Sequence, residues 1–112
     1  HRRKYAEGEL APERSFYFRG PEGKLNLRAQ NLMLFLQLAD GVDDDTWLHH
    51  LRAHDYSRWL GETIKNPEIA AEVMRVENDA ALDAHGSRTR IREIVGAHYT
   101  LPAMGASPPR MA

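Results

Sequence analysis

The chain has 112 residues, contains no cysteine and carries a formal net charge of −1 at neutral pH. This length predicts one domain, and the lack of cysteine excludes disulfides and cysteine-ligated zinc sites within it. The small net charge argues against a basic nucleic-acid-binding surface, and the apolar runs are too short to span a bilayer. We therefore expect a cytoplasmic protein with no nucleic-acid partner and no membrane partner.

The two ends of the chain differ in composition from the middle. Residues 1–14 are polar and charged, which predicts a flexible linker. Residues 101–112 contain three prolines and several small residues, which predicts a disordered tail. The folded unit is expected to be a helical domain over residues 15–100.

The first element expected in this domain is a short β-hairpin. Three aromatic residues at 16–18 are followed by Gly-Pro-Glu-Gly at 20–23 and an alternating stretch at 24–27, a pattern typical of two strands joined by a turn. An isolated hairpin is only marginally stable, so it should pack on helices. Because side chains alternate along a strand, Tyr17 and Arg19 should be exposed on one face.

Two helices are expected next. Residues 29–39 are rich in leucine and apolar almost all round, which predicts a central buried helix. Gly41 is expected to end it in the left-handed conformation. The three aspartates at 43–45 are placed to cap and begin a second helix. Its core-facing residues should be Trp47, Leu48 and Leu51.

Three more helices complete the prediction. Asp55 is expected to cap the third, Asn66 with Pro67 to begin the fourth, and Ser87 to begin the fifth. The apolar residues expected inside are Tyr56, Trp59, Leu60, Ile64, Ile69, Ala70, Val73, Met74, Ile91, Ile94, Val95 and Tyr99. The predicted fold is thus mostly α, with about five short helices packed around one core and a small N-terminal β-hairpin.

A histidine-rich stretch is the first candidate site. His50 and His54 lie one helical turn apart with Asp55 beside them, a spacing compatible with a shared metal ion. A zinc-protease helix, however, needs glutamate after its first histidine, and the chain has Leu51 there. We favour a capped helix junction with His50 hydrogen-bonded and His54 solvated. We assign no catalytic and no cofactor-binding residue.

Two charged clusters are further candidate sites. Asp43-Asp44-Asp45-Thr46 resembles the Asp-x-Asp-x-Thr nucleophile motif of phosphohydrolases, but the threonine comes one residue early and no buried strand precedes it. Helix capping is the better interpretation. Arg88 and Arg92 share a helix face that Arg90 does not, so we expect ion pairs with the acidic fourth helix or Glu93 instead of a phosphate clamp.

The aromatic residues admit two interpretations. Most of them, including both tryptophans, stand at spacings typical of a core. Tyr17 and Arg19, on the expected open face of the hairpin, are the candidate interaction residues because exposed aromatic surface often marks an interface.

Several of these segments together resemble a known family. They are the aromatic strand at 15–20, Ala-Gln-Asn-Leu at 29–32 and the stretch from His50 to Trp59. The last is similar to uncharacterised prokaryotic domains with the pattern His-x4-Asp-aromatic-x2-Trp. A closer resemblance is to the C-terminal segment of actinobacterial haloacid-dehalogenase-type hydrolases, which residues 90–100 also resemble. The chain departs at His54, where the pattern usually has glycine, and at Gly61.

The resemblance implies a non-catalytic accessory or regulatory domain that follows a phosphohydrolase domain. The partner would be that catalytic domain, in the same chain or in another protein, and a homo-oligomer is a further option. Any Mg²⁺ would belong to the upstream catalytic domain, and no cofactor is expected in this segment. The alternative is a freestanding protein-interaction module that uses Tyr17 and Arg19.

Overall fold

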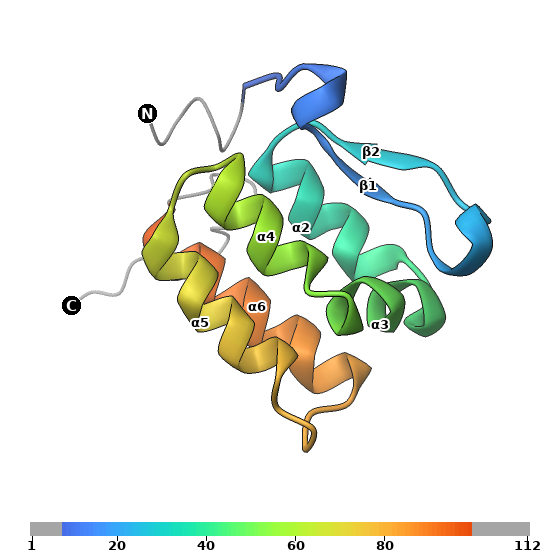
Figure 1. The fold of residues 1–112 in the computed structure, drawn as a ribbon, viewed down its shortest axis with the longest axis vertical. Helices are drawn as coiled ribbons and strands as arrows, with labels where there is room; N and C mark the ends of the chain where they lie inside the picture. The colour runs from blue at the N-terminus through green and yellow to red at the C-terminus, as the bar shows by residue number, and fades with distance from the viewer. Residues whose placement is uncertain (1–7, 100–112) are drawn as a thin grey trace, which may run out of the picture.

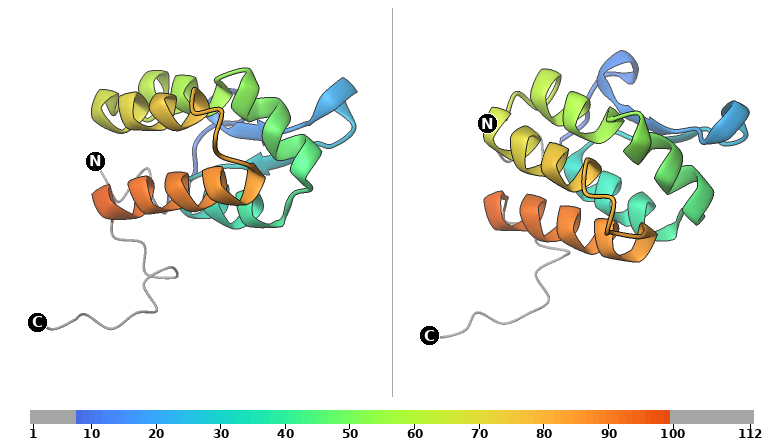
Figure 2. Two further views of the ribbon diagram at one scale, coloured as in Figure 1. Left: turned by 90° about the horizontal axis from the view of Figure 1, so that it is seen from below. Right: turned by 60° about the horizontal axis from the view of Figure 1, so that its bottom comes forward.

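The computed structural model describes residues 8–99, and its helices form two layers with a β-hairpin projecting at one end (Figures 1 and 2). Helices α4 and α5 lie in one layer, and α2 and α6 lie beneath them. In chain order the elements are η1 (Pro12–Arg14), β1 (Phe16–Phe18), η2 (Pro21–Gly23), β2 (Leu27–Ala29), α2 (Leu32–Gly41), α3 (Asp44–Arg52), α4 (Asp55–Glu62), α5 (Pro67–Glu77) and α6 (Ala84–His98).

The predicted fold class is confirmed, with five α-helices and one two-stranded antiparallel sheet in the described part of the chain. The register pairs Phe16 with Ala29 and Phe18 with Leu27. The second strand therefore begins three residues later than the 24–27 stretch that we expected. Residues 19–26 form a longer connection that contains the short helix η2.

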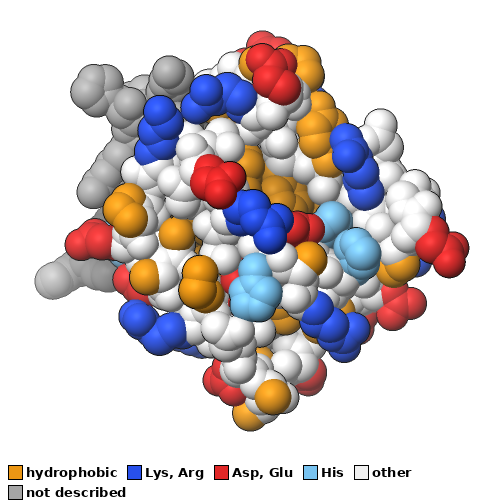
Figure 3. All heavy atoms as spheres, in the orientation of Figure 1, with side chains coloured by type: hydrophobic (Ala, Val, Ile, Leu, Met, Phe, Trp, Pro, Cys, Tyr) orange, Lys and Arg blue, Asp and Glu red, His pale blue; other side chains and the backbone are white. Residues whose placement is uncertain are grey.

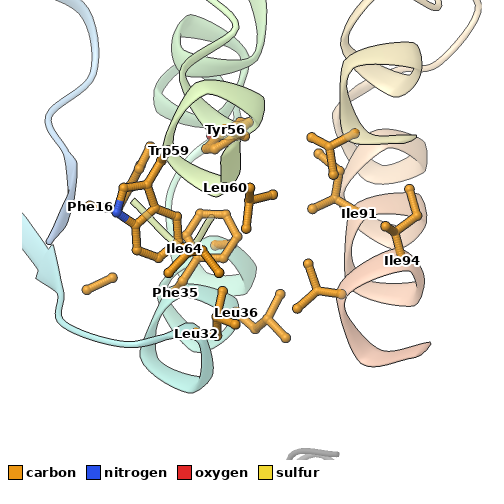
Figure 4. Packing of buried hydrophobic residues seen from close by; sticks show 14 of the residues in the cluster. Phe16, Leu32, Phe35, Leu36, Tyr56, Trp59, Leu60, Ile64, Ile91 and Ile94 are labelled. Atoms are coloured by element: carbon orange, nitrogen blue, oxygen red, sulfur yellow. The ribbon is translucent and has the colours of Figure 1, made fainter. Parts of the chain in front are cut away.

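One hydrophobic core lies between the layers (Figure 4). It extends from Phe16 of the hairpin and Trp59 of α4 to Ile91 and Ile94 on α6, and it includes Phe35 of the central helix. The central position predicted for this leucine-rich helix is confirmed, because Leu32, Phe35 and Leu36 are all buried. The dense apolar sequence of α2 is what lets it contact several other elements at once.

The two largest fully buried side chains, Trp47 and Tyr56, satisfy their polar atoms inside the core. Trp47 and Tyr56 stack with ring centroids 4.4 Å apart. The indole nitrogen of Trp47 donates to the Ser87 hydroxyl at 2.8 Å, and the Tyr56 hydroxyl donates to the Trp47 carbonyl at 2.9 Å. Burial raises the pKa of Tyr56, so its hydroxyl stays a proton donor.

Several helix boundaries differ from the sequence prediction. The helix expected over 29–39 spans Leu32–Gly41, because Ala29 belongs to β2. Gly41 is the last residue of α2 and does not have the left-handed conformation, because Val42 closes the helix in extended conformation with its N–H on the Leu38 carbonyl. Helix α6 begins at Ala84 with Asp83 as its cap, three residues before Ser87. Ser87 is instead buried as the partner of Trp47.

One core prediction was wrong. Met74 is 46% exposed, while Val76, which we did not assign to the core, is buried. Ile69 and Val73 face inward as expected, so α5 buries a narrower stripe than its apolar sequence suggested.

Gly20 occupies a position where the chain requires glycine. Its φ of 75° lies in the region that side chains disfavour, and a Cβ there would stand 2.7 Å from the Thr46 hydroxyl oxygen. The absence of a side chain lets the hairpin approach the start of α3.

Part of the predicted linker packs against the domain. Leu10 is buried, and the Arg14 carbonyl accepts a 2.9 Å hydrogen bond from the Trp59 indole. Residues 1–7 and the predicted tail at 101–112 lie outside the described residues. Within residues 8–99, no helix has the length and apolar character needed to cross a bilayer.

Candidate functional site

A surface depression of about 320 Å³ lies between β1 and α4. Its hydrophobic floor and charged rim are visible on the face shown in Figure 3. The hairpin and the α3–α4 junction both contribute, so residues from distant parts of the sequence meet here. The lining residues are Phe16, Tyr17, Arg19, His50, Asp55, Arg58, Trp59, Glu62 and Thr63.

His50 connects the hairpin to the helices at the edge of this depression. Its Nε2 atom accepts the backbone N–H groups of Arg19 and Gly20 at 3.1 and 3.2 Å, and Nδ1 lies 2.8 Å from a carboxylate oxygen of Asp55. Because Nε2 accepts two hydrogen bonds, the ring proton resides on Nδ1 and is donated to Asp55. Both ring nitrogens are therefore engaged, as the capped-junction interpretation predicts.

Asp55 does not cap its helix as predicted. The cap position belongs to His54, which has the left-handed conformation with φ of 61°, and Asp55 is the first helical residue. One oxygen of Asp55 accepts from His50, and the other accepts from Arg58 at 2.8 Å. The carboxylate thus orients the imidazole instead of closing the helix end.

The helix end is closed by Glu77, a residue that we did not predict to have any role here. Its side chain is 0% exposed. One carboxylate oxygen accepts the backbone N–H of Ser57 at 3.0 Å, and the other accepts the Ser57 hydroxyl at 2.6 Å. The last residue of α5 therefore supplies the N-terminal cap of α4, where a negative charge is favoured.

His54 makes a second contact with the same carboxylate. Its Nδ1 atom lies 3.0 Å from Glu77, and its side chain is partly exposed. The predicted solvated role of His54 is therefore only half correct. Glycine adopts the left-handed backbone conformation without strain. This is a physical reason why glycine suits position 54.

The three candidate metal ligands separate into two hydrogen-bonded groups. His50 binds Asp55 and the hairpin, while His54 binds Glu77. In the part of the chain that the structure describes, no three His, Cys, Asp or Glu side chains are grouped closely enough to hold a metal ion.

Tyr17 and Arg19 lie together on one face, but only Arg19 is exposed as expected. The Arg19 guanidinium carbon stands 4.5 Å from the centre of the Tyr17 ring, a cation–π arrangement. Arg19 is exposed, whereas Tyr17 is half-buried and donates its hydroxyl to the Pro12 carbonyl at 2.8 Å. The pair forms one wall of the depression.

Asp43 caps α3, and Asp44 and Asp45 lie in its first turn, as we expected. Asp43 accepts the backbone N–H and the hydroxyl of Thr46 at 3.1 and 2.7 Å. The hydroxyl donor, with smaller contributions from the backbone N–H and Lys24, lowers the pKa of Asp43 to about 2. The aspartate motif thus caps the N-terminus of a helix.

The three arginines of α6 form separate ion pairs. Arg90 pairs with Glu93 at 2.8 Å, as expected. Arg88 pairs with Asp44 and Arg92 with Asp40, so the predicted pairing with the acidic fourth helix is wrong for both. The reason is that α6 presents this face to α2 and the start of α3.

Comparison with known proteins leaves the family of this chain open. No family model, no curated protein and no solved structure matches it.

Proposed function

We propose that this chain is a non-catalytic accessory or regulatory domain of a haloacid-dehalogenase-type phosphohydrolase. It would bind the catalytic domain, in the same chain or in another protein. The depression between β1 and α4 is the surface best suited to that contact, because it combines aromatic rings with charged groups that reach solvent.

The observation that carries the proposal is the engagement of His50. A histidine that acts as a general base needs a free ring nitrogen within reach of the substrate. Here Nε2 already accepts two backbone N–H groups, and Nδ1 donates to Asp55. The strongest candidate for proton transfer is thus used to hold the hairpin against the helices.

A second candidate function is a freestanding protein-interaction module. The stacked pair of Tyr17 and Arg19 favours it, since tyrosine and arginine are enriched in the central residues of protein interfaces. Both functions use the same surface and differ in whether the partner is a phosphohydrolase.

A Mg²⁺ ion would belong to the catalytic domain and not to this segment. We place the protein in the bacterial cytoplasm, and self-association into a homo-oligomer is a second way in which the exposed surface would be covered.

Phosphate release from p-nitrophenyl phosphate tests the proposal. The assay is run on this chain and on the longest open reading frame that contains it. We expect turnover by the longer protein and none by this chain. Turnover by this chain would contradict the accessory role, and a longer protein without turnover would contradict the link to phosphohydrolases.

A further inference from the structure

The depression has a cation placed beside its aromatic floor. Arg19 is exposed, and its guanidinium is held against the Tyr17 ring. Among residues 8–99, no carboxylate forms an ion pair with it. Stacking on a ring leaves the N–H donors at the edge of a guanidinium available, and these donors fit a carboxylate.

The other charges of the rim are arranged along α4. Arg58 is engaged with Asp55 near the start of the helix, on the side where His50 meets Arg19. Glu62 stands at the end of the helix, beyond Trp59, and is exposed without an ion pair in the described residues. The available positive charge therefore lies at one end of the depression and the available negative charge at the other.

The size of the depression limits what it can hold. At about 320 Å³ it lies at the lower end of the range for small-ligand sites, and it is open to solvent (Figure 3). Such a shape encloses a single side chain better than a whole small molecule. Tyr17 and Arg19, which reach solvent at its wall, are of the residue types that contribute most to protein-interface affinity.

We infer that the depression binds an extended polypeptide segment of the partner that presents an acidic side chain to Arg19 and an aromatic side chain to the floor. In an extended segment, residues i and i+2 point to the same side about 7 Å apart. A sequence such as Glu-x-Phe therefore presents both side chains to the same surface. The inference rests on the proposed accessory function and specifies the chemistry of its contact.

Titration of the ¹⁵N-labelled chain with acetyl-Ala-Glu-Ala-Phe-Ala-amide tests the inference. We expect shifts of the Arg19 and Gly20 amide signals and of the Trp59 indole signal. The matching peptide with glutamine in place of glutamate should bind roughly tenfold more weakly, because the charge-assisted pair with Arg19 is lost. No shift, or equal affinity for the two peptides, would overturn the inference.

Substitutions identify which residue of the depression gives the preference for the glutamate peptide. Arg19→Met should remove the preference for the glutamate peptide, whereas Arg90→Met, at an exposed arginine on α6, should keep it. Glu62→Gln should strengthen binding about twofold by removing a like charge from the rim. A preference that survives Arg19→Met would contradict the assignment of the acidic side chain.

A small aromatic acid is the competing occupant. If 3-phenylpropionate binds as tightly as the glutamate peptide and to the same residues, the polypeptide assignment is wrong. The titration does not involve phosphate release, so failure of the peptide contact and failure of the phosphohydrolase link give different results.

Discussion

His50 shows how a single residue joins two parts of this fold. It lies 30 residues from Gly20 in sequence and accepts that residue's N–H together with the N–H of Arg19. The hydrogen bonds between the two strands do not include these two N–H groups. The chain leaves the strand at Gly20, which has a positive φ and approaches Thr46. The imidazole therefore replaces the hydrogen bonds that a regular strand would have made.

Replacement of His50 should be costly. We expect His50→Ala to lower the free energy of unfolding by about 2–4 kcal/mol, because it leaves two backbone donors and Asp55 without their partner. Urea denaturation measures this. The neighbouring His49 is exposed on the same helix, so His49→Ala should have little effect. Equal losses for both variants would show that His50 is not a structural connection.

At the level of the elements, the junction between α4 and α5 depends on a contact distant in sequence. The residue at the cap of α4, His54, has no side-chain bond to its own helix end. Glu77 accepts the free Ser57 N–H instead, from the last turn of α5. The two helices are therefore joined by a hydrogen bond as well as by apolar packing.

We expect Glu77→Ala to destabilise the protein by about 2–3 kcal/mol, since it removes a buried carboxylate with hydrogen bonds to the start of α4. Thermal unfolding followed by circular dichroism measures the loss. Glu68→Ala is the matched control, because Glu68 is exposed in the first turn of the same helix. A loss no larger than that of the control would contradict the capping role.

At the level of the whole molecule, Trp59 connects three parts of the structure. Its ring packs near Phe16 of the hairpin and Phe35 of α2. Its indole N–H donates to the Arg14 carbonyl, so the segment before the hairpin is also attached. Removing this ring would loosen the hairpin and the floor of the depression together.

Trp59→Ala should cost about 3–5 kcal/mol, a large share of the stability of a domain of this size. Chemical denaturation measures the cost. Met74→Ala provides the comparison, because the Met74 side chain is largely exposed and its loss should be nearly neutral. A small effect of Trp59→Ala would show that the core does not depend on this residue.

Local patterns in the sequence were enough to predict the element types. The apolar run of α2, the Asn66-Pro67 start of α5 and the aspartate cap of α3 depend on neighbours within one turn. The alternation of side chains along a strand likewise predicted that Tyr17 and Arg19 lie on one face of the hairpin. Spacing along a helix or strand places such residues without knowledge of the rest of the fold.

The contacts between distant segments could not be predicted in this way. The assignment of Glu77 to α4, of Ser87 to Trp47 and of Arg88 to Asp44 depends on which helix faces which, and no local pattern contains that information. The depression arises for the same reason, since its walls come from a strand and a helix that meet only when the chain has folded. Local free energies select helices and strands, whereas burial and the pairing of polar groups across the core select their arrangement.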